Sequence, residues 1–180
     1  MTTDQLVSIY CGRGAAAYFG EPVTVTEHSL QAARFAQRSN APDGLVIAAL
    51  LHDIGHLIEP VPGDIADWKT DAGHERIGSR WLALRFGPDV CEPVRLHVPA
   101  KRYLCAMDPA YFATLSPASV VTLRLQGGQM SPAETEAFEA EPYFREAVLL
   151  RQWDDQAKIA GYKTLDFAHY LPLIERLLAT

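Results

Sequence analysis

Residues 44–51 read Gly-Leu-Val-Ile-Ala-Ala-Leu-Leu, and this run constrains the fold more than any other segment. It is apolar on nearly every side of a helix, so other elements must surround it, as they surround the central helix of a bundle. The run is far too short to cross a bilayer. It ends at His52 and Asp53, which would be costly to bury unless they bind something. The sequence therefore predicts a buried site at the end of a central helix.

The rest of the chain also has helical spacing of apolar residues and little strand alternation. The predicted helices cover about 4–18, 24–39, 43–57, 70–86, 88–97, 117–126, 131–139, 142–160 and 166–178. Pro99 is expected to stop the helix that begins at residue 88, and Gly55 to break the helix that contains His52. Without an internal repeat or a low-complexity linker, we expect an all-α, single-domain helical bundle over residues 1–180.

Charge and cysteine content exclude several classes of protein. Lys plus Arg number 16 against 22 Asp plus Glu, a net charge of −6, and no basic run is present, so nucleic acid is not an expected partner. No export signal or membrane anchor is recognisable. The three cysteines form no C-x-x-C pair, which suits reduced thiols in the cytoplasm. These features indicate no oligomeric state.

Several histidines are predicted to point into the core. A lone histidine on an apolar helix face is more often a hydrogen-bonded structural residue than a metal ligand. A metal site is therefore indicated only where several histidines point in the same direction. By three-and-four spacing, His28 shares a face with Ala32, His74 shares one with Trp81, and His97 follows Val94.

These three histidines join His52 and Asp53, and a late pair, Asp154 and Asp155, adds a carboxylate. Four histidines and two carboxylates fit two metal ions, with one aspartate able to bridge them. The absence of thiolate favours iron or manganese over zinc. Periodicity does not choose between Asp154 and Asp155.

The order of these residues resembles a known family. His28, then His52-Asp53 within His-Asp-Ile-Gly-His, then a distant carboxylate, is similar to the H…HD…D pattern of the HD-domain superfamily. With His74 and His97 between them, the spacing resembles the mixed-valent di-iron oxygenases related to myo-inositol oxygenase. From Tyr18 to about Lys158 the chain is similar to the phosphonate-cleaving HD-domain oxygenases.

The resemblance implies a bundle of the HD-domain type around a pair of iron ions, Fe(II)/Fe(III), with O2 as co-substrate. It makes six residues the iron ligands: His28, His52, Asp53, His74, His97 and Asp154. Asp53 would bridge, and Asp154 is selected because Arg151 stands three residues before it, as in that family. The implied reaction cleaves the C–P bond of an (R)-1-hydroxy-2-(amino or trimethylammonio)ethylphosphonate, giving phosphate and glycine or glycine betaine.

The same resemblance assigns the catalytic and substrate-binding residues. Tyr18 would guard the iron site, Glu21 would sense the amino end of a small zwitterionic hydroxyphosphonate, and Lys101 would hold the phosphonate. Ser119 and Arg151 would also contact the substrate. Alternatives exist for four of these: core packing for Tyr18, simple exposure for Glu21, a solvated face for Lys101 with Arg102, and pairing of Arg151 with Asp154 or Asp155 along the helix.

Two other functions fit the same ligands. Most proteins with an HD dyad are metal-dependent phosphohydrolases, and a small phosphate ester would also use Lys101 and Arg151. A regulatory module that binds a phosphorylated ligand without turnover is a third possibility, although it has little need for a dinuclear site. Tyr18, Glu21 and Ser119 favour the oxygenase. His56 and His169 have no assigned role, and a structural or outer-shell position is expected for His56.

Overall fold

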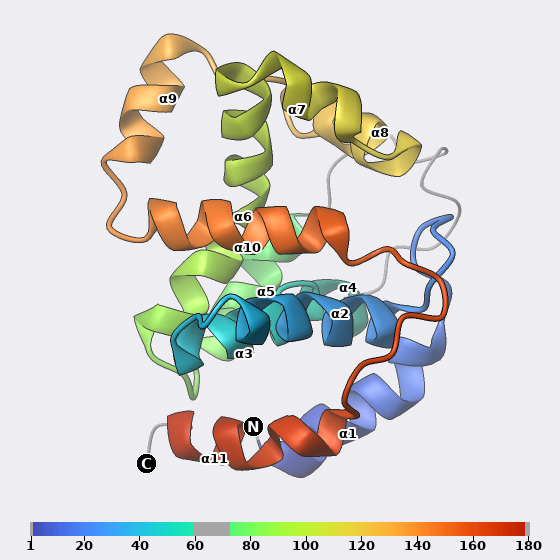
Figure 1. Ribbon diagram of the computed structural model, residues 1–180. Helices are drawn as coiled ribbons and strands as arrows, with labels where there is room; N and C mark the ends of the chain where they lie inside the picture. Colours follow the sequence, from blue (N-terminus) through green and yellow to red (C-terminus); the bar gives the residue numbers. More distant parts are fainter. Residues whose placement is uncertain (1, 60–72, 179–180) are drawn as a thin grey trace.

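The computed structural model describes residues 2–59 and 73–178, which form a bundle of α-helices (Figure 1). This part of the chain contains no β-strand, and its one extended pairing is an isolated bridge between Ala17 and Thr24. The prediction of an all-α fold is confirmed. None of the helices in the described ranges is long and apolar enough to cross a membrane.

The helices are short, with the exception of α6, and follow one another closely. In chain order they are α1 (Thr3–Gly12), η1 (Arg13–Ala15), α2 (Val25–Arg38), α3 (Asp43–Leu51), α4 (Ile54–Ile58), α5 (His74–Leu82), α6 (Pro88–Met107), α7 (Pro109–Thr114), α8 (Pro117–Leu125), α9 (Pro132–Glu139), α10 (Phe144–Gln156), η3 (Phe167–Tyr170) and α11 (Leu171–Leu177). Figure 1 shows α6 running from the body of the bundle to a second group formed by α7, α8 and α9.

The helix α3 is the centre of the core. Every residue from Gly44 to Leu51 is buried, which confirms the predicted central helix. Helices α2, α6, α10 and α11 pack around it. Because α3 has no solvent face, its carboxyl end delivers the residues that follow it directly into the interior.

The prediction that Pro99 stops the helix at residue 97 is wrong. The helix α6 continues through Pro93 and Pro99 to Met107. Proline removes one backbone hydrogen bond and crowds the preceding turn, at a cost of about 3 kcal/mol in a helix interior. Burial of the apolar side chains of Ala100 and Cys105 beyond it offsets part of that cost. The continuation places Lys101 one turn beyond His97.

The predicted helix over 43–57 is interrupted, but not at Gly55. The chain leaves helical geometry at Asp53, whose ψ is +11°, and re-enters it as α4, with Gly55 inside. Gly55 instead allows α4 to pack closely against α5, since a Cβ atom there would lie 2.0 Å from the carbonyl oxygen of His74. The break turns the Asp53 side chain away from the axis of α3.

Other boundaries also differ from the predictions. The helix expected over 4–18 ends at Gly12 in α1, and Gly14 in η1 lies so close to α2 that a Cβ would clash with Thr26. The helix over 70–86 begins at His74 within the described residues, and residues 70–72 lie outside them. The helix over 142–160 covers only Phe144–Gln156. The short helix α7, started by the Asp108 cap and Pro109, was not predicted.

Candidate active site

Six of the predicted site residues meet in the core, delivered by five different segments. They form two groups in which the potential ligand atoms lie within 4.8 Å of one another: His28, His52 and Asp154 in one group, and Asp53, His74 and His97 in the other. All six are buried. Imidazole nitrogen and carboxylate oxygen in such groups are a suitable donor set for first-row transition metals.

Asp53 lies between the two groups and faces both. Its Oδ1 is 3.3 Å from Nε2 of His74 and 3.7 Å from Nε2 of His97. Its Oδ2 is 3.5 Å from Nε2 of His52 and 3.7 Å from Nε2 of His28. One carboxylate that directs each oxygen to a different pair of imidazoles has the arrangement of a bridging ligand.

Backbone carbonyls orient three of the histidines. Nδ1 of His28 donates to the carbonyl of Ala157 at 2.9 Å, and Nδ1 of His52 donates to that of Ala49 at 2.9 Å. In the other group Nδ1 of His97 donates to the Val94 carbonyl at 2.7 Å. A carbonyl can only accept, so the proton of each neutral ring is on Nδ1 and the lone pair is on Nε2.

The four imidazoles meet in pairs through their Nε2 atoms. Nε2 of His28 lies 3.1 Å from Nε2 of His52, and Nε2 of His74 lies 3.1 Å from that of His97. Burial lowers the pKa of both His52 and His97. In the neutral forms of His28 and His52 the two Nε2 lone pairs face each other, and a cation between them would relieve their repulsion. The nitrogen and carboxylate donors of each group therefore fit a metal ion.

Asp154 and Asp155 have different partners, although they are adjacent in α10. Oδ1 of Asp154 lies 3.3 Å from Nε2 of His28, so this carboxylate faces the histidine cluster. Asp155 instead accepts hydrogen bonds from Arg151 and from the Tyr111 hydroxyl. Arg151 also pairs with Oδ2 of Asp154 at 2.8 Å. The pairing of Arg151 along the helix, one of the alternatives from the sequence, is present, and Arg151 lines the pocket as well.

The two inward carboxylates are ionised. Burial alone would raise the pKa of Asp53, but His52 and His74 beside it outweigh burial and hold the pKa well below its usual range. Burial would also raise the pKa of Asp154, but the charge of Arg151 beside it outweighs burial and lowers that pKa. Both carboxylates are thus anionic and able to bind cations at neutral pH.

A tight turn presents Tyr18 and Glu21 to the same cavity. The amide of Glu21 donates to the Tyr18 carbonyl at 2.7 Å, with Phe19 and Gly20 both at positive φ, +44° and +79°. The Tyr18 hydroxyl donates to Oδ2 of Asp53 at 2.7 Å, and its ring stacks on His28 at 4.0 Å. Tyr18 thus packs in the core, as one alternative from the sequence expects, and its hydroxyl also contacts Asp53. Simple exposure of Glu21 is wrong, since its side chain is only 12% exposed.

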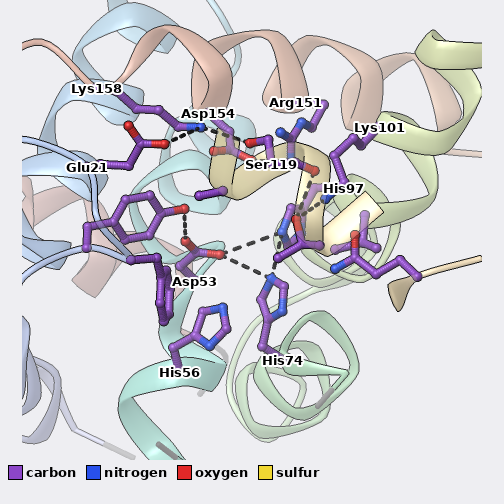
Figure 2. Close-up of a pocket in the computed structure, with 16 residues that line it drawn as sticks. Glu21, Asp53, His56, His74, His97, Lys101, Ser119, Arg151, Asp154 and Lys158 are labelled. Carbon is purple, nitrogen blue, oxygen red and sulfur yellow. Dashed lines mark hydrogen bonds and ion pairs between the residues drawn. The ribbon is translucent and has the colours of Figure 1, made fainter. Parts of the chain in front are cut away.

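Cationic side chains also reach the cavity, with Lys158 beside Glu21 and with Lys101 and Arg151 farther away (Figure 2). The cavity holds about 50 Å³ and is lined by Lys101, Ser119, Arg151 and Lys158, among others, and by members of both histidine groups. Lys101 is buried, so the expectation of a solvated face is wrong for it, and its ammonium donates to Thr122 at 2.8 Å. Burial lowers the pKa of Lys101 to about 7. An anion in this cavity would meet Arg151 and Lys158, and its charge would favour the protonated form of Lys101.

Two titratable residues of the cavity were not singled out as site residues by the sequence. Lys158 follows α10 by two residues, and its ammonium lies 3.5 Å from Oε1 of Glu21. Its spacing of four from Asp154 was an available signal, because a chain leaving the end of α10 remains near that carboxylate. His56 stacks on His74 at 3.9 Å and meets the edge of Phe19 at 4.6 Å, which agrees with an outer-shell position.

Gly55→Ala is expected to damage this site through the backbone. The added Cβ would press on the His74 carbonyl, so α5 must move and His74 with it. Overpacking of this kind costs about 1–3 kcal/mol. We expect a lower Tm and a lower metal content per chain, measured by thermal denaturation and elemental analysis. Gly12→Ala is the matched control, because a Cβ there meets nothing within 4 Å. Equal metal content in the two variants would contradict this role for Gly55.

Comparisons with known proteins agree with the geometry. The family model described as HD domain matches residues 25–155. The chain is 45% identical over 167 residues to hydroxymethylphosphonate dioxygenase of Gimesia maris, covering 90% of this chain and 81% of the relative. It is 40% identical over 169 residues to [1-hydroxy-2-(trimethylamino)ethyl]phosphonate dioxygenase (glycine-betaine-forming) of Leisingera caerulea, covering 94% of this chain and 86% of the relative.

Proposed function

The chain belongs to the HD-domain family, and from this premise we propose that it is an oxygenase that cleaves the C–P bond of a small 1-hydroxyphosphonate with O2. The balanced reaction is R–CH(OH)–PO3²⁻ + O2 → R–COO⁻ + HPO4²⁻ + H⁺, in which four electrons pass from carbon to O2. The observation that carries the proposal is that two groups of potential metal ligands lie side by side, with Asp53 between them, next to a cavity lined by lysine and arginine side chains. Two relatives named as phosphonate dioxygenases support it.

The proposed metal centre uses both ligand groups. His28, His52 and Asp154 would hold one iron ion, His74 and His97 would hold the other, and Asp53 would bridge them. When bound, an Fe(II)/Fe(III) pair supplies a Lewis acid for the substrate's hydroxyl and phosphonate oxygens and a reduced ion for O2. The backbone carbonyls of Ala49, Val94 and Ala157 keep three of the imidazoles in the required tautomer.

The residues of the cavity then bind and orient the substrate. Lys101, Arg151 and the Ser119 hydroxyl are placed to take the phosphonate by charge-assisted hydrogen bonds. Tyr18 holds one oxygen of Asp53 through its hydroxyl and covers His28 with its ring, so it controls access to that part of the centre. Glu21 faces the end of the substrate remote from the phosphonate, where an amine would bind.

A metal-dependent phosphohydrolase acting on a phosphate ester is the competing function, since the same ligands can hold metal ions that activate water. The names of the two relatives favour the oxygenase. We further propose that residues 1–180 form one domain that works in the cytoplasm on a small hydroxyphosphonate.

The proposal is tested by loading the protein with iron without oxygen and then partly oxidising it. We expect a mixed-valent EPR signal that shifts on addition of hydroxymethylphosphonate or 1-hydroxy-2-aminoethylphosphonate. Inorganic phosphate should be released from one of them in air and not under argon. A redox-silent metal together with turnover of phosphate esters would show that the protein is a phosphohydrolase.

A further inference from the structure

Glu21 and Lys158 face each other at one end of the cavity, and Figure 2 shows Lys158 between Glu21 and Ser119. The ammonium of Lys158 is 3.5 Å from Oε1 of Glu21, with the two side chains 13% and 12% exposed. Oε1 accepts no hydrogen bond from the described residues. Glu21 and Lys158 are thus held together by the attraction of their charges and not by a hydrogen bond. Another cation could therefore take the place of the lysine.

Two hydroxyls hold the Lys158 ammonium in addition to Glu21. The ammonium donates to Oγ of Ser119 at 3.1 Å and to Oγ of Ser116 at 3.3 Å. Both serines lie at the start of α8. Lys158 could therefore give up its contact with Glu21 without losing every hydrogen-bond partner.

The other cations of the cavity have different partners. Arg151 is paired with Asp154 and Asp155, and Lys101 donates to Thr122. Among the described residues, no cation other than Lys158 forms an ion pair with Glu21. The charge of Glu21 is consequently compensated before any substrate enters.

We propose that Lys158 is an internal counter-ion that competes with the substrate's cationic end for Glu21, and so sets how strongly the cavity selects an ammonium-bearing hydroxyphosphonate over an uncharged one. This inference depends on the proposed function. It makes Lys158 a specificity-determining residue and requires no step of the chemistry to pass through it.

Two substrates of equal size, one with and one without a cation, affect the Glu21–Lys158 pair differently. A substrate without a cation leaves the Glu21–Lys158 pair intact. A substrate ammonium must displace Lys158, and the two like charges then lie close together in a poorly hydrated cavity, where charges interact more strongly than in water. Part of the attraction between Glu21 and the ammonium is thereby cancelled, so the cavity accepts both kinds of substrate.

The decisive experiment uses isosteric substrates on the iron-loaded protein, 1-hydroxy-2-aminoethylphosphonate and 1-hydroxypropylphosphonate, which exchange an ammonium for a methyl group. The measured quantity is the ratio of their kcat/KM values. We expect Lys158→Met to raise this ratio at least about tenfold, equivalent to about 1.4 kcal/mol. Any loss of phosphonate binding affects both substrates and cancels in the ratio.

Three further variants complete the test. Glu21→Gln should lower the ratio, and in that background Lys158→Met should raise it by a smaller factor, because only the direct repulsion between the two ammonium groups is then removed. Lys158→Gln repeats the charge removal with a polar side chain and serves if the methionine variant folds poorly. Lys163→Met, at an exposed position outside the cavity, should leave the ratio unchanged. An unchanged ratio in both Lys158 variants, or an increase that is just as large without Glu21, would overturn the inference.

A binding measurement separates this inference from the proposed function. The dissociation constants of 2-aminoethylphosphonate and propylphosphonate, which lack the 1-hydroxyl group, are compared by calorimetry. Lys158→Met should shift their ratio toward the ammonium compound by a similar factor. If neither hydroxyphosphonate is turned over but this shift occurs, the proposed function fails and the role of Lys158 stands. Turnover with no shift in either ratio would overturn the role of Lys158 and leave the proposed function intact.

Discussion

Asp53→Asn is expected to abolish activity and to lower the affinity for both metal ions together. Each carboxylate oxygen of Asp53 faces a different pair of imidazoles, so one neutral amide removes an anionic oxygen from both groups. Loss of an outer-shell partner costs about 10–100-fold in metal affinity, and loss of this shared ligand should exceed that range. The measurements are iron per chain and phosphate release from the hydroxyphosphonate.

Asp43→Asn is the matched control, because Asp43 lies on the surface, where it pairs with Arg176. It should keep the metal content and activity of the unaltered protein. Circular dichroism shows whether the Asp53 variant keeps its helices. If folded Asp53→Asn protein bound two iron ions with unchanged affinity, Asp53 would not be the bridging ligand.

The two adjacent aspartates of α10 are expected to behave in opposite ways. Asp154→Ala removes the carboxylate that lies 3.3 Å from His28, so one of the two ions should be lost together with activity. Asp155→Ala should retain both ions, because Asp155 contacts Arg151 and Tyr111 instead of the histidines. Its expected defect is a higher KM for the phosphonate, caused by a less firmly held Arg151.

Iron content and the EPR signal of the oxidised protein distinguish the two variants. Arg151 keeps its ion pair with Asp154 when Asp155 is replaced, so that variant should remain folded. Loss of iron from Asp155→Ala combined with full retention in Asp154→Ala would overturn the choice of Asp154 as the ligand.

The core of the fold could be predicted from the sequence because its signal is local. A run without a polar face, residues 44–51, has to be central, and every one of these residues is buried in α3. The extent of α6 could not be predicted in this way. Pro99 signals a stop, and only the tertiary packing of the residues after it, such as Ala100 and Cys105, shows that the helix continues. The helix α7 buries no residue, so it leaves no apolar periodicity.

The histidines of the site could also be predicted from a local pattern. The contacts that surround them could not, because those contacts join segments that are far apart in the sequence. His28, His74 and His97 lie on apolar helix faces, so spacing places them inward. The choice between Asp154 and Asp155 depends on which side of α10 meets α2, and that is set by packing. Lys158 lies beyond the helix end, where its spacing of four from Asp154 is a weak signal, and its contact with Glu21 joins segments far apart in the sequence.

The most direct test of the account follows oxygen uptake and phosphate release together in one sealed reaction of the iron-loaded protein with hydroxymethylphosphonate and with 1-hydroxy-2-aminoethylphosphonate. The balanced reaction predicts one O2 consumed for each phosphate released, and no phosphate when oxygen is withheld. Phosphate release at the same rate under argon, without oxygen uptake in air, would contradict the assignment of the chain as a C–P-cleaving oxygenase.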